Sequence, residues 1–303
     1  MRTDHQLRNV KNAFQLAVLF GIILGGAASQ SSAQISIMPL GDSITRGNPS
    51  PDSGVGGYRD PLYTDLASAG VSFSFVGANN ASATTLLTTN NDQYHNGYGS
   101  YQIADITNNL NGNSQPAGDP NLGGYWLTGN HGTGRSAVSP NIVLLEIGAN
   151  NFALNPGESM ASDEQDLQTL LTTFHGLSPK SIILVGGAIP GNNISTQAAT
   201  YDAYIKNTLV PSLSYTRYVD IYDGFVNADG SQNTSLYIGD NLHPNSAGYA
   251  VMANEWAPAI EVAAASVPEP SAWALDAMGL CGLVLWGSRA RLPKLGRRAV
   301  GIM

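Results

Sequence analysis

The sequence predicts a three-layer α/β/α sandwich around a five-stranded parallel β-sheet. Short strand-like runs alternate with longer helix-like segments from Ile35 onward, and this alternation is typical of parallel α/β folds. Two runs, Ile142–Leu145 and Ile182–Val185, contain no polar residue, as expected of strands buried on both faces. With 303 residues, 43% of them hydrophobic, the chain is also long enough for one sizeable core.

Each strand of the predicted sheet is followed along the chain by a segment of helical character. The strands are expected at Ile35–Gly41, Val71–Gly77, Asn141–Gly148, Ser181–Ile189 and Tyr218–Tyr222. The helices are expected at Tyr58–Ala69, Tyr101–Leu110, Ser162–His175, Thr196–Leu213 and Ser246–Ala264. The stretch from Ala78 to Pro140 is rich in Asn, Gly and Thr and is too long for an ordinary connection, so we expect it to be functional or partly mobile.

Charge and cysteine content exclude several classes of function. The formal net charge is −8 and the basic residues cluster at the two termini, which leaves an acidic body with no electrostatic footprint for nucleic acid. The single cysteine, Cys281, allows no disulfide in the body. The five histidines show no metal-ligand spacing. We therefore expect no nucleic-acid partner and no metal.

The N-terminus has the order of a secretory signal peptide. Arg8 and Lys11 form a positive region, Ala13–Gly26 is apolar, and small residues precede Gln34. The alternative is a membrane anchor, but the apolar run is shorter than the ~20 residues that a spanning helix needs. We expect residues 1–33 to be removed.

The C-terminus, residues 265–303, combines three features in a fixed order. A Pro-rich linker at Val267–Ser271 precedes an apolar run at Ala272–Trp286, which contains Asp276. A basic end follows, at Arg289, Arg291, Lys294, Arg297 and Arg298. Such a basic end stays on the cytoplasmic side of a membrane, while the acidic residue and the short run disfavour a permanent span.

This tail, with Pro268-Glu269-Pro270 at its start, resembles the PEP-CTERM sorting signal of certain Gram-negative bacteria. The resemblance implies recognition and processing by an exosortase. It also implies a transient association with the inner membrane before the body reaches the cell envelope or the exterior. The alternative is an ordinary tail anchor.

A serine follows the first predicted strand directly, in the segment Gly41-Asp42-Ser43-Ile44-Thr45. Open α/β folds place their sites at the carboxyl ends of the strands. The glycine permits a tight turn, and the backbone N–H groups after it can face a developing oxyanion. A lone Gly-x-Ser is more often a helix or turn cap, so this motif needs a partner.

The partner is the segment Asp240-Asn241-Leu242-His243-Pro244, just before the last predicted helix. A serine nucleophile needs a base, and the base needs a carboxylate to orient it. Asp240 and His243 are close enough to share one loop. Each could be a solvated loop residue on its own, but their pairing with Ser43 in this chain order favours catalysis.

These motifs resemble the SGNH (GDSL-type) hydrolase family over Ile35–Ala264, and we expect residues 34–264 to form the catalytic domain. Gly41-Asp42-Ser43 resembles the first block of the family, Gly148-Ala149-Asn150-Asn151 the third, and Asp240-Asn241-Leu242-His243 the fifth. The family implies a flavodoxin-like strand order 2-1-3-4-5, in which the first and third strands are neighbours.

The resemblance also implies a role for each matching residue. Ser43 would attack the ester carbonyl, His243 would relay the proton and Asp240 would orient His243. Asn150 would donate its side-chain amide to the oxyanion, together with the backbone of Ser43. No cofactor is implied.

Two departures from the family pattern concern the oxyanion site. The third block ordinarily ends in Asp, whereas this chain has Asn151. The second block should supply a glycine N–H, and the candidate segment is His95–Tyr101. Ser100 aligns with the family glycine and Gly99 precedes it, so either backbone N–H is a candidate donor.

Further segments resemble carbohydrate esterase family three, the acetyl xylan esterase group. They are Ile37–Leu40, Gly56–Arg59 and Phe75–Gly77. The substrate-contact candidates are Asp42, Tyr58, Arg59 and Tyr98. For Tyr58 and Arg59 the alternative is packing in the core or structural pairing.

The expected function is that of a secreted serine esterase that removes short acyl groups, acetyl above all, from carbohydrate through an acyl-enzyme on Ser43. Loops rich in Asn, Gly and Tyr suit a sugar surface better than an acyl chain. Two alternatives remain. One is a lipase or thioesterase, which should show an apolar groove for the acyl chain. The other is a non-catalytic envelope or matrix protein on the same fold.

Overall fold

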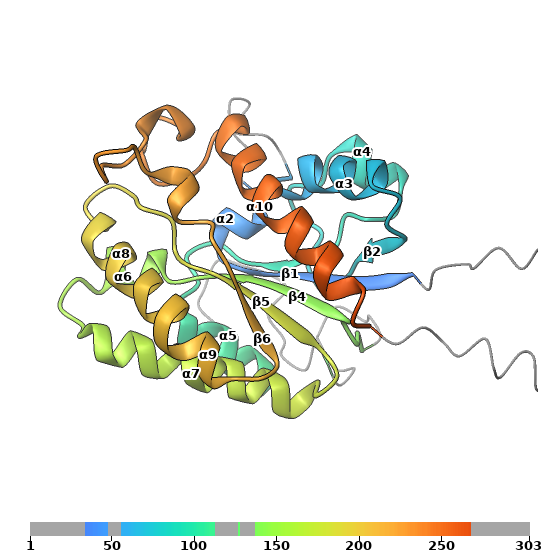
Figure 1. Ribbon diagram of the computed structural model, residues 1–303, viewed down its shortest axis with the longest axis horizontal. Helices are drawn as coiled ribbons and strands as arrows, with labels where there is room; N and C mark the ends of the chain where they lie inside the picture. Colours follow the sequence, from blue (N-terminus) through green and yellow to red (C-terminus); the bar gives the residue numbers. More distant parts are fainter. Residues whose placement is uncertain (1–33, 48–55, 113–126, 128–136, 268–303) are drawn as a thin grey trace, which may run out of the picture. The chain divides into compact units, whose positions relative to one another are not determined.

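A parallel β-sheet forms the centre of the computed structural model, which describes residues 34–47, 56–112, 127 and 137–267 (Figure 1). Its strand order is β2-β1-β4-β5-β6. These strands are β1 (Ile35–Gly41), β2 (Phe73–Phe75), β4 (Ile142–Glu146), β5 (Ile182–Gly186) and β6 (Thr216–Val219). A two-residue strand, β3 (Asn96–Gly97), pairs with the end of β1. Because β3 lies off this path, the five main strands numbered in chain order follow the predicted order 2-1-3-4-5. The predicted parallel α/β fold and its strand order are confirmed.

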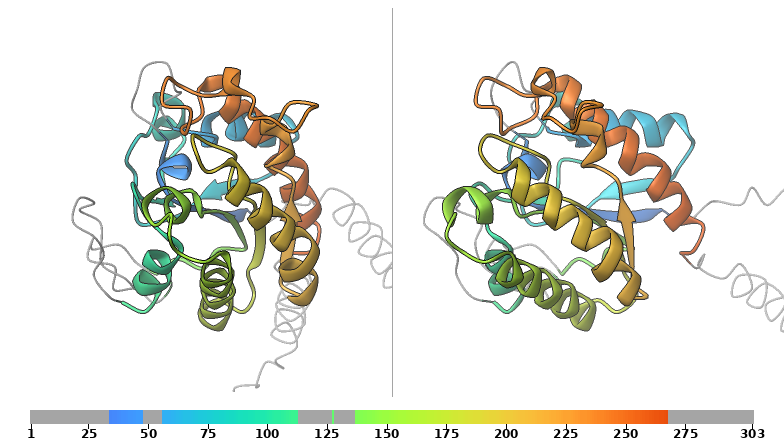
Figure 2. Two further views of the ribbon diagram at one scale, coloured as in Figure 1. Left: turned by 90° about the vertical axis from the view of Figure 1, so that its left-hand side faces the viewer. Right: turned by 60° about the vertical axis from the view of Figure 1, so that its left-hand side comes forward.

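Helices cover both faces of the sheet (Figures 1 and 2). One face carries α3 (Arg59–Ser68) and α10 (Ser246–Ala264), and the other carries α5 (Ile103–Leu110), α7 (Met160–Leu177) and α8 (Ser195–Tyr204). The shorter helices are α2 (Ser43–Arg46), α4 (Thr85–Thr89), α6 (Ala149–Leu154), α9 (Val210–Ser212), the π-helical η1 (Ile205–Leu209), and the 3₁₀ turns η2 (Asp223–Phe225) and η3 (Thr234–Leu236).

Helix α10 shows how the sequence determines one of these layers. Its N-cap is Asn245, whose side chain accepts hydrogen bonds from the second and third backbone amides of the helix. One face of the helix is buried against the sheet, with large side chains at the helical spacing of three and four residues: Tyr249, Met252, Trp256, Ile260. Pro258 lies inside the helix, on the side away from this row.

The bounds of several predicted elements shift in the structure, and two of these shifts have a clear physical reason. The last strand ends at Val219 rather than Tyr222, because Ile221 donates its backbone N–H to Val219 and the chain turns into η2. The predicted helix Thr196–Leu213 is divided into α8, η1 and α9. Pro211, in the first turn of α9, has no backbone N–H and ends the regular helical ladder.

The register aligns the carboxyl ends of the three central strands. Leu40 of β1 pairs with Leu145 of β4, which pairs with Val185 of β5, and all three side chains are buried. One residue later, Gly41 pairs with Glu146, which pairs with Gly186. β1 lies between β2 and β4, so the chain adds β2 on one side of β1 and then continues with β4 on the other side. The edge beyond Gly41 is therefore the topological switch point, where ligands bind in such folds.

Some sequence predictions lie outside the described residues. They include the signal peptide at residues 1–33, the sorting tail from residue 268 onward, and most of the stretch between residues 113 and 136. None of the helices within the described ranges is both long and apolar enough to cross a membrane.

Candidate active site

The turn between β1 and α2 presents Ser43 at the carboxyl edge of the sheet. Asp42 is the N-cap of α2, and its Oδ1 accepts the backbone N–H of Ile44 at 2.8 Å. Only glycine fits at position 41, because the Cβ of any other residue would collide with the carbonyl oxygen of Glu146 on β4. The close approach of β1 to β4 therefore fixes where the nucleophile emerges.

The imidazole of His243 lies between Ser43 and Asp240. The distance from Ser43 Oγ to His243 Nε2 is 2.8 Å, and the distance from His243 Nδ1 to Asp240 Oδ2 is 2.7 Å. A carboxylate only accepts, so the neutral imidazole carries its hydrogen on Nδ1 and leaves Nε2 free to accept the serine proton. The structure thus joins the three residues in the order that nucleophilic catalysis requires.

Asp240 also builds the loop that carries His243. Its Oδ1 accepts the backbone N–H groups of Leu242 and His243, each at 2.9 Å, and Asn241 adopts a left-handed conformation with φ +53°. Burial raises the pKa of Asp240, but these two amides and the imidazole lower it by more, so the net pKa lies below the ordinary value. Asp240 is therefore ionised at neutral pH.

Backbone contacts dock this loop on the body. Asn192, in the loop after β5, donates its backbone N–H to the carbonyl of Asn241 at 2.9 Å. Gln232 donates its side-chain amide to the same carbonyl at 2.8 Å. Ile238 donates its N–H to the carbonyl of His243 at 2.9 Å. The position of the imidazole therefore depends on bonds from three segments.

Asn150 lies on α6, directly after β4, with 9% of its surface exposed. Its Nδ2 donates to Asp42 Oδ2 at 3.2 Å and to the carbonyl of Tyr101 at 3.0 Å. Both amide hydrogens thus have acceptors, and donation to an oxyanion requires one of them to be shared. The Asp42 bond is the longer one, so its hydrogen is the better placed for sharing.

The predicted second block, His95–Tyr101, runs beside β1 through β3. The buried ring of His95 holds it, because Nδ1 accepts the N–H of Gly97 at 3.0 Å and Nε2 donates to the carbonyl of Ala81 at 3.0 Å. Gly99 packs under Arg46, whose Nη1 would lie 2.8 Å from an added Cβ. Ser100 is exposed and has φ +61°, the conformation that glycine adopts without strain.

The structure buries all four predicted substrate contacts in the interior. Tyr58, Arg59 and Tyr98 each have no exposed surface. Tyr58 packs against Trp256, with ring centroids 6.1 Å apart, and Tyr98 stacks on Tyr101 at 4.7 Å. These side chains pack in the core, which for Tyr58 and Arg59 is the alternative that the sequence left open.

Arg59 has a structural role of its own. Its guanidinium donates to the backbone carbonyls of Gln93 at 2.9 Å and of Arg46 at 3.0 Å. Burial lowers the pKa of Arg59 to about 10, so it remains charged. The residue ties two loops together around the end of β1.

Asp42, the fourth predicted contact, is also fully buried. It binds Ile44 and Asn150 instead of a substrate. Burial raises its pKa to about 6, while the Ile44 amide and the nearby His243 and Arg46 lower it. Asp42 therefore connects the nucleophile turn with the Asn150 amide as an anion at neutral pH.

Sequence reasoning missed Glu146, a fully buried carboxyl at the end of β4. A signal was available in the sequence, since a glutamate ends an otherwise apolar strand two residues before Gly148.

The described residues do not meet the requirements of a metal site. No cluster of three or more His, Cys, Asp or Glu side chains within the described ranges is placed to hold a metal ion.

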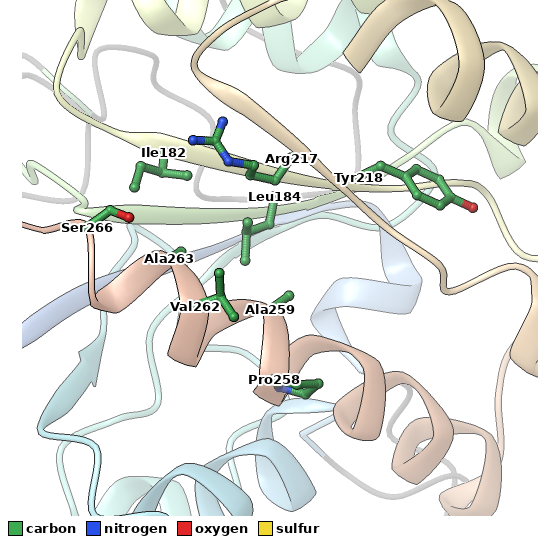
Figure 3. A pocket seen from close by; sticks show the side chains of 9 residues that line it. All are labelled: Ile182, Leu184, Arg217, Tyr218, Pro258, Ala259, Val262, Ala263 and Ser266. Carbon is green, nitrogen blue, oxygen red and sulfur yellow. The ribbon is translucent and has the colours of Figure 1, made fainter. Parts of the chain in front are cut away.

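An apolar groove of about 380 Å³ lies between α10 and the strands β5 and β6 (Figure 3). Ile182 and Leu184 of β5 and Val262 of α10 point into it, with Arg217 at its rim. Ile182 is the first residue of β5 and Arg217 the second of β6. The groove therefore lies toward the amino ends of the strands, whereas Ser43 lies at their carboxyl ends.

The family model described as GDSL-like lipase/acylhydrolase matches residues 37–256, which includes the β1 turn and the Asp240–His243 loop. The chain belongs to this family. Family membership makes it a carboxylic ester hydrolase, and its sheet matches the SGNH hydrolase fold.

Similar proteins share the esterase description. A multidomain esterase of Ruminococcus flavefaciens is 29% identical over 246 residues, which are 77% of this chain and 29% of the length of that protein. A family 3 carbohydrate esterase of Clostridium thermocellum superposes with a TM-score of 0.57 at 24% identity, over 78% of this chain and 100% of the other. The corresponding enzyme of Talaromyces cellulolyticus gives the same TM-score and coverage at 20% identity. These two structures establish similarity of fold.

Proposed function

We propose that this GDSL-family chain is an exported serine esterase that removes short acyl groups, acetyl above all, from carbohydrate. The observation that carries the proposal is the hydrogen-bonded row of Ser43, His243 and Asp240, with distances of 2.8 and 2.7 Å. The row needs no cofactor, because nucleophile, base and orienting carboxylate are all side chains of the chain.

The geometry supports an acyl-enzyme mechanism in two steps. In the first step His243 Nε2 takes the proton of Ser43 as Oγ attacks the ester carbonyl, and the imidazolium then protonates the leaving sugar oxygen. In the second step water attacks the acyl group on Ser43, with His243 as base, and the imidazolium returns the proton to Ser43 Oγ as the carboxylic acid is released. Asp240 holds the imidazole and stabilises its charge in both steps.

The oxyanion of each tetrahedral intermediate needs donors that are in place beforehand. The proposed donors are the backbone N–H of Ser43, the amide of Asn150 and the N–H of Gly99 or Ser100. Asn150 is nearly buried and held by Asp42 and Tyr101. The side chain is therefore held in place while the hydrogen that it donates to Asp42 is shared with the oxyanion.

Two observations support carbohydrate rather than a lipid as the substrate. One apolar groove among the described residues lies at the opposite edge of the sheet from Ser43, so this groove cannot take a long acyl chain that is bound to Ser43. Two proteins of similar fold carry the name carbohydrate esterase family 3, and esters of carbohydrate are the substrates proposed for this chain.

We also propose export to the cell envelope or the exterior through a signal peptide and a PEP-CTERM-like tail read by an exosortase-type enzyme. Support comes from the order of linker, apolar run and basic end after Val267. Intact-mass measurement of protein from its own host tests this. A mature chain should begin near Gln34 and lack everything from about Ala272 onward, whereas uncut chains ending at Met303 in the membrane fraction would make the tail an anchor.

The catalytic proposal is tested with p-nitrophenyl acetate, a long-chain p-nitrophenyl ester and acetylated xylan. We expect acetate release from the first and third and little turnover of the second. Ser43→Ala should abolish the activity by several orders of magnitude, while the exposed Ser214→Ala serves as a serine control with normal rates. Preference for the long chain would favour a lipase. Full activity of folded Ser43→Ala would refute the mechanism.

A further inference from the structure

A second carboxyl, Glu146, lies at the end of β4, interacts electrostatically with Asp42 and takes no part in the mechanism above. It is the last residue of β4, paired with Gly41 on one side and Gly186 on the other. It has no exposed surface, and neither carboxyl oxygen has a hydrogen-bond partner among the described residues. Such a group is very costly to ionise.

The groups that face Glu146 come from several elements, and none of those in the described part of the chain is a cation. They are Asp42 from the β1 turn, Tyr58 at the start of α3, Tyr201 of α8, Tyr237 after η3, and the backbone amide of Ile189. The Ile189 amide lies near the carboxyl without completing a bond of normal geometry. Burial raises the pKa of Glu146 well above its ordinary value, the Asp42 charge raises it further, and the Ile189 amide opposes this only in part.

Asp42 is as fully buried as Glu146, but its carboxylate has hydrogen-bond donors. It accepts hydrogen bonds from Ile44 and Asn150, and the charges of Arg46 and of a protonated His243 favour its ionised form. Two carboxyls in one buried site cannot both ionise at neutral pH. Because Asp42 has the donors and Glu146 has none, the proton of the pair stays on Glu146.

We propose that Glu146 is a positioning residue of the oxyanion site, a neutral acid that leaves Asp42 as the single buried anion holding the Asn150 amide. The proposal rests on the esterase function proposed above. Glu146 touches no substrate and acts only through Asp42.

Ionisation of Glu146 would disturb this arrangement. A second negative charge in the same buried site would repel the Asp42 carboxylate and shift it away from its hydrogen bond with the Asn150 amide. The oxyanion donor would then lose its anchor. We therefore expect kcat to fall at alkaline pH, with little change in KM.

The test compares kcat against pH for the full chain and two matched variants, with p-nitrophenyl acetate. Glu146→Gln keeps the shape but cannot ionise, so its kcat should fall less than about tenfold at pH 7 and its alkaline decline should disappear or move to higher pH. Asp92→Asn changes another buried carboxyl, one that accepts the backbone amide of Phe75 on β2, and should keep the parent profile.

Two kinetic outcomes would overturn the proposal. One is a loss of kcat in Glu146→Gln of 100-fold or more at pH 7, which would mean that a charged carboxylate is needed there. The other is an alkaline decline identical to that of the parent chain.

An infrared measurement separates failure of this inference from failure of the esterase proposal. The parent chain should show the carbonyl band of a buried, protonated carboxyl at pH 7, and Glu146→Gln should lack it. This readout needs no substrate, so it stands even if no ester is hydrolysed. Identical spectra of the two proteins would refute the inference directly.

Discussion

Asp240→Asn separates the orienting role of Asp240 from its role in building the loop. The carboxylate makes three hydrogen bonds, two from the amides of Leu242 and His243 to Oδ1 and one with His243 Nδ1 through Oδ2. Asparagine has one oxygen and one NH₂ group. If the oxygen keeps the two amides, the NH₂ group faces His243 Nδ1.

The alternative orientation of the asparagine is worse. It would place the NH₂ group against two backbone N–H donors, which forfeits two bonds to retain one, at about 1 kcal/mol each before desolvation is counted. The loop is therefore retained and the imidazole changes tautomer, with its hydrogen now on Nε2 facing Ser43. In that form His243 cannot accept the serine proton.

We expect kcat of Asp240→Asn to fall by about 10⁴, which corresponds to about 5.4 kcal/mol of lost transition-state stabilisation. KM and the unfolding midpoint should change little. Steady-state kinetics on p-nitrophenyl acetate and thermal unfolding measure both. The control is Asp229→Asn, since Asp229 also accepts from a backbone amide and a side chain, those of Ser231, on an exposed loop. A fall in kcat below tenfold in a folded Asp240→Asn protein would refute the assigned role.

Three further predictions follow from the contacts. Asn150→Ala should lower kcat by roughly 10²–10³ with little change in KM; an effect confined to KM would place Asn150 in substrate binding. Arg59→Met should lower the free energy of unfolding by at least about 2 kcal/mol, because the carbonyls of Gln93 and Arg46 lose their donor, and urea titration would detect it. Glu146→Gln should gain stability relative to the parent as pH rises above 4.5, by up to about 1.4 kcal/mol per pH unit. The reason is that the folded parent retains a proton on Glu146 that the unfolded parent releases, whereas glutamine binds no proton in either state. A difference in the free energy of unfolding between variant and parent that is the same at pH 5 and pH 8 would contradict this.

The sequence was sufficient for the framework of the site. Buried apolar runs such as Ile142–Leu145 have few alternatives to central parallel strands, and parallel strands bring their carboxyl ends to one edge. Ser43 directly follows one such strand, and the third block with Asn150 follows another. The three-residue spacing of Asp240 and His243 predicted a shared loop, and the structure places both residues in one.

The direction of individual side chains was beyond the sequence. Tyr58 and Arg59 stand in a segment whose resemblance to carbohydrate esterase family three suggested a ligand contact, yet both are buried because the first turn of α3 faces the core. Glu146 was not predicted to take part in the site, because it ends a strand whose other residues are all apolar. Whether a polar side chain faces solvent or core depends on which helices cover it, and that is a property of the tertiary packing.

The burial of Asp42 gives the family's first motif a structural meaning that its chemistry alone does not. One carboxylate caps the helix that carries Ser43 and also holds the amide of Asn150. These two groups come from different strands, β1 and β4, and the reaction needs them within one site. At the surface, water could replace a lost hydrogen bond to this carboxylate, but in the interior it cannot. The bonds of Asp42 therefore couple the position of the Ser43 turn to that of the Asn150 amide. The same burial raises the pKa of Asp42 to about 6. In the proposal above, the proton on Glu146 keeps a second anion from forming beside Asp42, so the geometry of the site and the expected pH dependence of kcat both originate in the burial of these two carboxyls.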